Sequence, residues 1–460
     1  MRSRVLRAVM LLAVGCSTSE GRKPFSPLDS DGTHFRDLEG RVVLFRGINA
    51  RVAGVFDVTF ADGRKALEPI PELQNWDFER MRQLGFNLLR LPIQWSGVEP
   101  RKDEFDEAYL LQVDRVINDA ASAGLFVLVD LHQDAYSKEI GEDGAPLWAI
   151  HPPPTTLLEG PLTDLGERRL SAEVLAAFES FFDPDDPHGL QEQYFEMLEH
   201  VGRRYADHPA VVGIEIFNEP QTSESKLFRF HARAAARLRE AAPSKLIFFE
   251  PTAVRNITDS VTPSEEPFPI TGAVYSPHVY TLVLQGGDLK SFTIEDLRPS
   301  VESARLEAAS WKTPLFIGEF GAGPATPSVA KYLGIEQDLQ DEFLASSAFW
   351  LWKEESQGSW GLFDRVGTGW AERQEMVEIL SRPRAERIAG TPESVRLSSG
   401  QLAVRYRQAI HSPNVLYVPP RMTTKKVTCD GKTVTPAMQD GRLLVTCAGN
   451  GVHEVVIDLE

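Results

Sequence analysis

The 460-residue chain is poor in cysteine and in positive charge. It has three cysteines, and 48 lysines and arginines stand against 66 aspartates and glutamates, a formal net charge of −18 at pH 7. Nucleic acid binds to basic surfaces, because lysine and arginine replace the counterions around the phosphates. Since the chain has no cluster of basic residues, we expect no nucleic-acid partner and only weak attraction to anionic membranes.

Several familiar catalytic motifs are also missing. No glycine-rich phosphate loop follows an early strand, which disfavours an open, doubly wound nucleotide-binding sheet. No serine nucleophile elbow and no His-x-x-x-His zinc helix is present. The remaining composition, 42% hydrophobic and 25% charged, is typical of a globular protein. The chemistry must therefore come from other residues.

Residues 1–16 are typical of an export signal. Three arginines precede the apolar run 8–14, which is too short to span a bilayer and ends in Gly15 and Cys16. Gly15-Cys16 resembles the cleavage site of a bacterial lipoprotein, where the cysteine is acylated. Ordinary secretion after cleavage nearby is the alternative. We expect the protein to be secreted or anchored through Cys16 to the outer face of the cell membrane, with a polar linker over 17–32.

The other two cysteines lie in the last part of the chain. In an oxidising compartment Cys429 and Cys447 could form a disulfide, and two buried free thiols are the alternative. Around them, short alternating or apolar segments are separated by glycine-containing turns. This pattern of short strands and turns predicts a small antiparallel β-sandwich domain over residues 386–460.

Between the two ends of the chain, apolar strands alternate with amphipathic helices. Eight strands are expected, at 42–49, 87–95, 126–134, 214–220, 246–250, 272–280, 314–320 and 346–352. Strands that are apolar almost throughout, each followed by a helical stretch, indicate a closed (β/α)8 TIM barrel over residues 33–385. The long connection 135–189 is expected to act as a lid or a binding wall.

Polar and aromatic side chains collect where these strands end. The segment IEIFNEP (214–220) delivers Asn218 and Glu219, and PLFIGEF (314–320) delivers Glu319. The other strand-end residues are Arg90, Asp130, His132, Asp134, His278, Tyr280 and Trp352. In a TIM barrel the carboxyl ends of all strands meet at one face. Acids, an amide and aromatic rings at that face predict a sugar-binding pocket.

Two facing carboxylates are what retaining glycoside hydrolysis requires. We expect Glu219 to be the general acid/base, with its pKa raised by the charge of Glu319, and Glu319 to attack the anomeric carbon. Asn218 could hydrogen-bond the 2-hydroxyl of the sugar, and Arg90 and Tyr280 could hold Glu319 ionised. No metal and no cofactor is required.

Other interpretations of these residues remain open. The two glutamates could be structural ion-pair partners. Trp352, which could form a stacking floor for a pyranose, could instead be barrel core. Asp130, His132 and Asp134 could hold a metal ion, because carboxylates with imidazole suit zinc or manganese.

The set of strand-end residues resembles glycoside hydrolase family 5. The features that carry this resemblance are the Asn-Glu-Pro of strand four, the glutamate of strand seven, and the arginine, histidine, His-x-Tyr and tryptophan of strands two, three, six and eight. Within the family, DLHQDAYS (130–137), GAPLWAI (144–150), YSPHVY, IGEFG and AGTPE (389–393) resemble endoglycoceramidases.

This resemblance implies an enzyme that releases an intact oligosaccharide from the ceramide of a glycosphingolipid. It implies Glu219 as acid/base and Glu319 as nucleophile. The implied substrate-binding residues are Lys65, Asp134, Asn218, Tyr280 and Trp352, and the implied supporting residues are Arg90, Asp130, His132 and His278. We expect a monomer, and we expect apolar residues of the long loop to face the lipid, namely Leu147, Trp148, Ile150, Leu157 and Leu158.

Two further alternatives stay open. The same machinery could cut a polysaccharide such as a β-glucan or a mannan, or the protein could bind carbohydrate without catalysis. Neither the glycan series nor the choice between glucosyl and galactosyl attachment follows from the residues.

Overall fold

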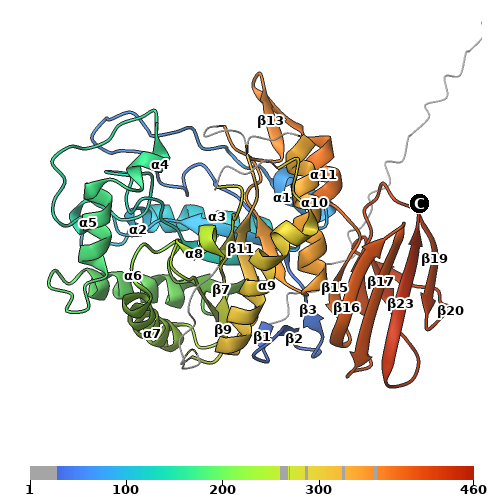
Figure 1. Ribbon diagram of the computed structural model, residues 1–460. Coiled ribbons are helices and arrows are strands. Elements are labelled where there is room, and N and C mark those ends of the chain that lie inside the picture. Colours follow the sequence, from blue (N-terminus) through green and yellow to red (C-terminus); the bar gives the residue numbers. More distant parts are fainter. Residues whose placement is uncertain (1–27, 260–267, 269, 285–288, 324–326, 356–359) are drawn as a thin grey trace, which may run out of the picture.

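The computed structural model describes residues 28–259, 268, 270–284, 289–323, 327–355 and 360–460 (Figure 1). The expected export signal, the lipidation site at Cys16 and most of the expected linker lie outside the described residues. Within the described part, no helix combines the length and apolarity that a membrane span needs.

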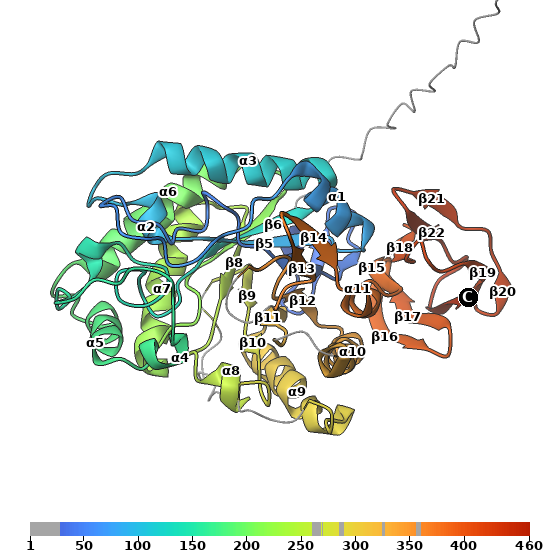
Figure 2. The ribbon, with the colours of Figure 1, turned by 90° about the horizontal axis from the view of Figure 1, so that it is seen from above.

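The centre of the protein is a closed barrel of parallel strands, as predicted (Figures 1 and 2). Its strands are β4 (Arg46–Asn49), β5 (Leu88–Ile93), β6 (Phe126–Leu131), β7 (Val211–Glu215), β8 (Leu246–Phe249), β9 (Ala273–Tyr275), β10 (His278–Val279), β11 (Phe316–Phe320) and β12 (Ser346–Phe349). Only two residues separate β9 from β10; β9 pairs with β8 and β10 with β11, so the two act as one strand. Pairing of β12 with β4 and a bridge between Tyr275 and Leu315 complete the circle.

Helices cover the outside of the barrel (Figure 2). They are α1 (Asn75–Gln83), α3 (Glu107–Ala123), α6 (Leu190–Tyr205), α7 (Glu224–Ala241), α9 (Ile294–Trp311), α10 (Pro327–Glu342) and α11 (Gln374–Leu380). Helix α3 shows why they form: Leu110, Val113 and Ile117 recur on one face and are buried, and Gly124 ends the helix with φ +86°.

The long connection after β6 is largely packed against the barrel. It contains a 3₁₀ turn η1 (Leu147–Ala149), α4 (Leu165–Arg168) and α5 (Ala172–Phe181), and a short α2 (Trp95–Val98) precedes it in the chain. Phe181 of α5 is fully buried and contacts the rings of Tyr194 and Phe217. The connection is therefore a wall of the barrel face, anchored by its aromatic residues.

A second core lies between two antiparallel sheets beside the barrel (Figures 1 and 2). One sheet has the order β16 (Gly390–Ser398), β17 (Gln401–Gln408), β23 (Val452–Leu459), β19 (Thr424–Cys429), β20 (Lys432–Thr433). The other has the order β1 (Leu28–Ser30), β2 (Phe35–Asp37), β3 (Val42–Val43), β15 (Arg384–Ile388), β18 (Asn414–Tyr417), β22 (Arg442–Val445), β21 (Ala437–Gln439). Cys429 and Cys447 are joined by a disulfide within this core.

The amino-terminal strands correct the predicted division of the chain. Residues 28–30, 35–37 and 42–43 do not form a linker and the start of the barrel; they extend the second sheet, because β3 pairs with β15. The barrel begins only at β4, and the predicted boundary between 385 and 386 lies inside β15. A hairpin that we did not predict, β13 (Phe363–Val366) and β14 (Gly369–Glu372), follows β12.

Candidate active site

A hollow of about 210 Å³ opens at the carboxyl ends of the barrel strands. Its lining includes both predicted catalytic glutamates, Glu219 and Glu319, together with Asn218 and Tyr280. His132, Asp134, Arg169, Trp350 and Trp360 also contribute to the wall. The structure thus brings residues from the ends of β6, β7, β10, β11 and β12, and from the wall after β6, to one place.

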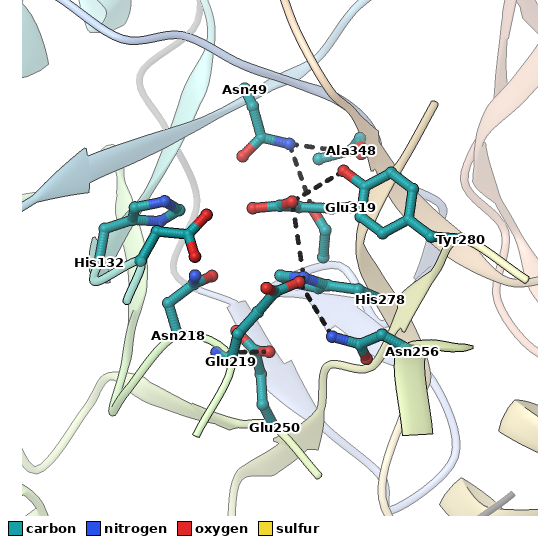
Figure 3. Close-up of polar contacts among 12 residues, drawn as sticks. Asn49, His132, Asn218, Glu219, Glu250, Asn256, His278, Tyr280, Glu319 and Ala348 are labelled. Carbon is teal, nitrogen blue, oxygen red and sulfur yellow. Dashed lines mark hydrogen bonds and ion pairs between the residues drawn. The ribbon is translucent and has the colours of Figure 1, made fainter. Parts of the chain in front are cut away.

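Glu219 and Glu319 face each other across His278 (Figure 3). His278 Nδ1 is 2.8 Å from Glu219 Oε1 and 3.5 Å from Glu319 Oε2. One carboxylate oxygen of each glutamate and one ring nitrogen of His278 lie within 4.8 Å of one another. Retaining glycosidases hold their two carboxyl groups about 5 to 5.5 Å apart, and inverting ones hold them farther apart. The spacing here is that of double displacement.

Glu319, on β11, is fixed by two donors. Arg90 Nη1 donates to its Oε1 at 2.7 Å, and the Tyr280 hydroxyl donates to its Oε2 at 2.8 Å. Burial, together with the charge of Glu319, raises the pKa of Tyr280 well above its ordinary value. Tyr280 therefore keeps its proton and remains a donor, and Glu319 is held in the orientation of a nucleophile.

Arg90 is the central cation of the site and is fully buried. Besides Glu319, its guanidinium contacts Asn49 at 3.0 Å, Asp130 at 3.1 Å, Glu215 at 2.6 Å, Asn218 at 2.8 Å and Glu250 at 3.4 Å. A guanidinium carries five N–H donors in a rigid, planar arrangement, so one arginine can bind acceptors on several sides at once. Arg90 thus positions groups from several barrel strands relative to each other.

Glu219 stands four residues beyond the end of β7, with a positive φ of +40°. Its Oε1 accepts from His278 and, at 2.9 Å, from Asn256 Nδ2. A residue other than glycine in this conformation is strained, and such strain is concentrated at functional sites. The strand predicted at 214–220 in fact spans Val211–Glu215, so the prediction began three residues and ended five residues too late.

The predicted rise in the pKa of Glu219 is wrong. Burial does raise this pKa, but the hydrogen bond and the charge of His278, with the charges of Arg169 and His132, outweigh it and hold the pKa at about 2. The pKa of His278 is in turn raised well above its ordinary value, because the charges of Glu250 and Glu319 outweigh the effect of burial. The prediction fails because the imidazole of His278 lies between the two carboxylates.

Asn218 is held on both sides. Its Oδ1 accepts from Arg90, and its Nδ2 donates to the Gln133 carbonyl at 2.9 Å. Asp130 and His132 are 2.7 Å apart, and the His132 ring stacks on Trp350 with centroids 5.5 Å apart. These residues lie where the sequence predicted them.

The contacts of the strand-three residues disfavour the alternative metal site. Asp130 is shared between Arg90 and His132, and Asp134 forms an ion pair with Arg169, which comes from the end of α4. Asp130 and Asp134 are thus matched by two different cations. Asp134 does line the hollow, as expected of a residue that contacts the sugar.

Two predicted substrate-binding residues do not line the hollow. Trp352 is fully buried; its indole N–H donates to Asp77 at 2.8 Å and its ring packs on Phe363, so it is barrel core and not a stacking floor. Lys65 is exposed and is not among the residues that line the hollow. Trp350 and Trp360 are the tryptophans that do contribute to the wall.

The polar residues of the site that were not predicted include Arg169, Asn49, Glu215, Glu250 and Asn256. Glu250 Oε2 accepts from the backbone N–H of Glu219 at 3.1 Å, and burial raises its pKa to about 8. Asn49, Glu215 and Glu250 end strands β4, β7 and β8 or directly follow them, so the reasoning that found Glu319 could have found them. Asn256 lies on a short helix and carried no such signal.

A TIM barrel with two glutamates of this spacing above its strand ends defines the class of retaining glycoside hydrolases. Comparison with known protein families identifies the family to which the chain belongs. The family model "Cellulase (glycosyl hydrolase family 5)" matches residues 71–356, and the chain belongs to this family.

The chain is also similar to named relatives. It is 28% identical over 333 residues to endoglycoceramidase I of Rhodococcus hoagii, covering 66% of this chain and 64% of that protein. It is 26% identical over 164 residues to an endoglycoceramidase of Cyanea nozakii, covering 31% of this chain and 32% of the relative. The matches thus cover less than two thirds of these relatives.

Solved structures resemble the protein over almost its whole length. A structure of an endogalactoceramidase has a TM-score of 0.74 and 25% identity, covering 94% of this chain and all of the other. Endoglycoceramidase II of Rhodococcus sp., bound to a cellobiose-like imidazole, has the same TM-score and identity over 92% of this chain and 98% of the other.

Proposed function

We propose that the protein is a retaining endo-β-glycosidase that hydrolyses the linkage between an oligosaccharide and ceramide in glycosphingolipids. The observation that carries the proposal is the pair of carboxylates of Glu219 and Glu319, which lie within 4.8 Å of each other across His278. Membership of family 5 and the relatives named endoglycoceramidase support the choice of reaction and substrate.

In the first step, Glu319 attacks the anomeric carbon while Glu219 gives a proton to the oxygen that leaves with ceramide. The bond from the sugar to that oxygen breaks, and an ester between the sugar and Glu319 forms. Arg90 and Tyr280 orient Glu319 for this attack. Asn218, held by Arg90 and Gln133, faces the hollow where a sugar hydroxyl would bind.

Glu219 must gain a proton before this step, because His278 and Arg169 hold its pKa at about 2. A bound substrate excludes water from the hollow and so favours the neutral acid. In the second step Glu219 takes a proton from water, and the resulting hydroxide displaces Glu319 from the sugar. The ester has no negative charge, so the pKa of His278 falls while the ester exists.

The wall after β6 limits where the lipid can bind. Trp148 packs edge-to-face on Trp95, and Ile150 is 2% exposed, so these two side chains hold the wall to the barrel. Leu147 is 43% and Leu157 38% exposed. These two leucines remain candidates for contact with the alkyl chains, together with Leu284, which lines the hollow and is 45% exposed.

Export completes the proposal. The sequence of residues 1–16 supports secretion or a lipid anchor at Cys16, and the disulfide between Cys429 and Cys447 suits an oxidising compartment. We propose a monomer at the outer face of the cell.

The test is a panel of glycosphingolipids, soluble β-glucan and mannan, with the products identified by mass. Release of intact oligosaccharide and ceramide is expected. Activity on the polysaccharides alone would mean that the substrate is a polysaccharide and not a glycolipid. Activity on none of the substrates would favour a protein that only binds carbohydrate.

A further inference from the structure

The short helix α8 (Arg255–Thr258) brings an unpredicted amide into contact with the catalytic pair. Asn256 is 2% exposed, and its Nδ2 donates to Glu219 Oε1 at 2.9 Å (Figure 3). Its backbone carbonyl accepts from the N–H of Tyr280 at 3.2 Å, and the Tyr280 hydroxyl donates to Glu319. One residue therefore connects the acid/base to the donor that holds the nucleophile.

Helix α8 is itself fixed from outside the site. Arg255 is fully buried, and its Nε donates to Glu307 of α9 at 3.0 Å. Its Nη2 donates to the Ser300 carbonyl, also on α9, at 3.2 Å. At the end of α8, Asp259 accepts from the Ser300 hydroxyl at 2.8 Å. Because these contacts hold α8 to α9, Asn256 cannot follow Glu219 if that side chain moves.

We propose that Asn256 is a positioning residue for the acid/base Glu219; this rests on the proposed function. Glu219 Oε1 accepts two hydrogen bonds, from Asn256 and from His278. The proton for the leaving oxygen is then carried by Oε2, and the carboxyl plane is fixed by the two donors on Oε1. The amide of Asn256 does not titrate, so it holds Oε1 in both protonation states of Glu219.

The test compares one sugar on two leaving groups. The preferred glycan is presented on ceramide, a poor leaving group that needs a proton, and on dinitrophenol, which leaves without one. For Asn256→Ala we expect kcat/KM on the ceramide substrate to fall roughly ten- to hundredfold, a fraction of the usual contribution of a general acid. On the dinitrophenyl substrate, kcat/KM should change by less than about threefold, because attack by Glu319 is unaffected.

Asn256→Asp gives a second readout at almost unchanged shape. Near neutral pH the new carboxylate faces Glu219 as a like charge, so the ceramide activity should fall below that of Asn256→Ala. At lower pH the new carboxyl is protonated and can donate again, so the activity relative to wild type should recover as the pH falls. Asn256→Ala should show no such recovery. The melting temperatures of both variants would be measured to check that they fold.

Val254→Ala is the matched control, because Val254 directly precedes α8 and is 64% exposed. It should have wild-type activity on both substrates. A wild-type protein without glycosidase activity would overturn the proposed function and this inference with it. An active wild type, with an Asn256→Ala variant that is unchanged or that loses both activities equally, would overturn the positioning role alone.

Discussion

Two carboxylates in this protein have similarly lowered pKa values but different kinds of partner. Glu219 lies at the barrel face, and Glu386 lies on β15 between the barrel and the second core. Both have a pKa of about 2, although removal from water raises the pKa of a carboxyl group. Glu386 is held by two arginines: Arg442 Nη2 donates to it at 2.8 Å, and Arg82 of α1 lies at 3.2 Å. Glu219 is held mainly by His278.

The difference explains which of the two can work as an acid. Arginine keeps its proton at every pH at which proteins are folded, so the charges around Glu386 cannot change and the contact serves only to join the two parts of the chain. A histidine changes its charge when neighbouring charges change. Glu219 is therefore the carboxylate whose environment responds to a substrate.

The largest expected effect is that of removing the nucleophile. Glu319→Ala should lower turnover by on the order of 10⁴-fold or more, because no covalent intermediate can form. Its stability should match or exceed that of the wild type, because one of several like charges around Arg90 is removed. Turnover assays and thermal unfolding check the two halves of the prediction, and a clear loss of stability would assign Glu319 a structural role.

Removing the acid should cost somewhat less. Glu219→Ala is expected to lose roughly 10²- to 10⁴-fold in kcat/KM on ceramide substrates. Azide, which needs no general base, should restore part of the turnover and give a glycosyl azide. Glu219→Gln is the isosteric control. If azide gave no such product, Glu219 would not be the base of the second step.

Glu386→Gln should show the opposite pattern. It leaves Arg82 and Arg442 without their buried carboxylate, and breaking a buried ion pair costs about 3 to 5 kcal/mol of unfolding free energy. Activity well below the melting temperature should stay at the wild-type level, because Glu386 lies outside the hollow. Denaturant unfolding and kcat/KM are the measurements. A variant with unchanged stability and reduced activity would show that Glu386 acts in catalysis and not in stabilising the fold.

The same contact predicts a pH dependence. The pKa of Glu386 is lowered from 4.5 to about 2 on folding, so its ionised form stabilises the folded protein fully above pH 4.5. That contribution is lost as the pH falls from 4.5 toward 2. The difference in unfolding free energy between wild type and Glu386→Gln should therefore shrink over this range. A difference that stays constant would mean that the arginines do not act on this carboxylate.

The smallest expected effect is at Lys65. Because Lys65 is exposed and does not line the hollow, Lys65→Ala should change KM by less than about twofold, the range of ordinary surface substitutions. Steady-state kinetics on the preferred glycolipid check this. A marked rise in KM would show that Lys65 does contribute to substrate binding.

Sequence reasoning worked best where the signal is local. The eight apolar strands, their helices and the catalytic pair follow from short stretches such as 214–220 and 314–320. The prediction that Trp352 binds the sugar failed, because a tryptophan at a strand end gives the same sequence pattern whether it faces a sugar or the core. Its partner Asp77 lies 275 residues away in the chain and could not be foreseen.

Long-range pairing explains the other errors. The amino-terminal strand β3 pairs with β2 and with β15. Only its pairing with the distant β15 places residues 42–43 in the second sheet and not in the barrel, and no local pattern signals that pairing. The pKa of Glu219 depends on His278, whose position between the two carboxylates is a product of the closed barrel. Asn256 reaches Glu219 from a four-residue helix that no periodicity predicts.

Trapping the covalent intermediate tests the central claim most directly. The protein would be incubated with a dinitrophenyl 2-deoxy-2-fluoro-β-glycoside of the preferred glycan, digested, and mapped by mass spectrometry. We predict that the sugar is attached to the peptide that contains Glu319, on that side chain. Attachment to another residue, or steady hydrolysis of the glycolipid with inversion and no adduct, would contradict double displacement at this pair.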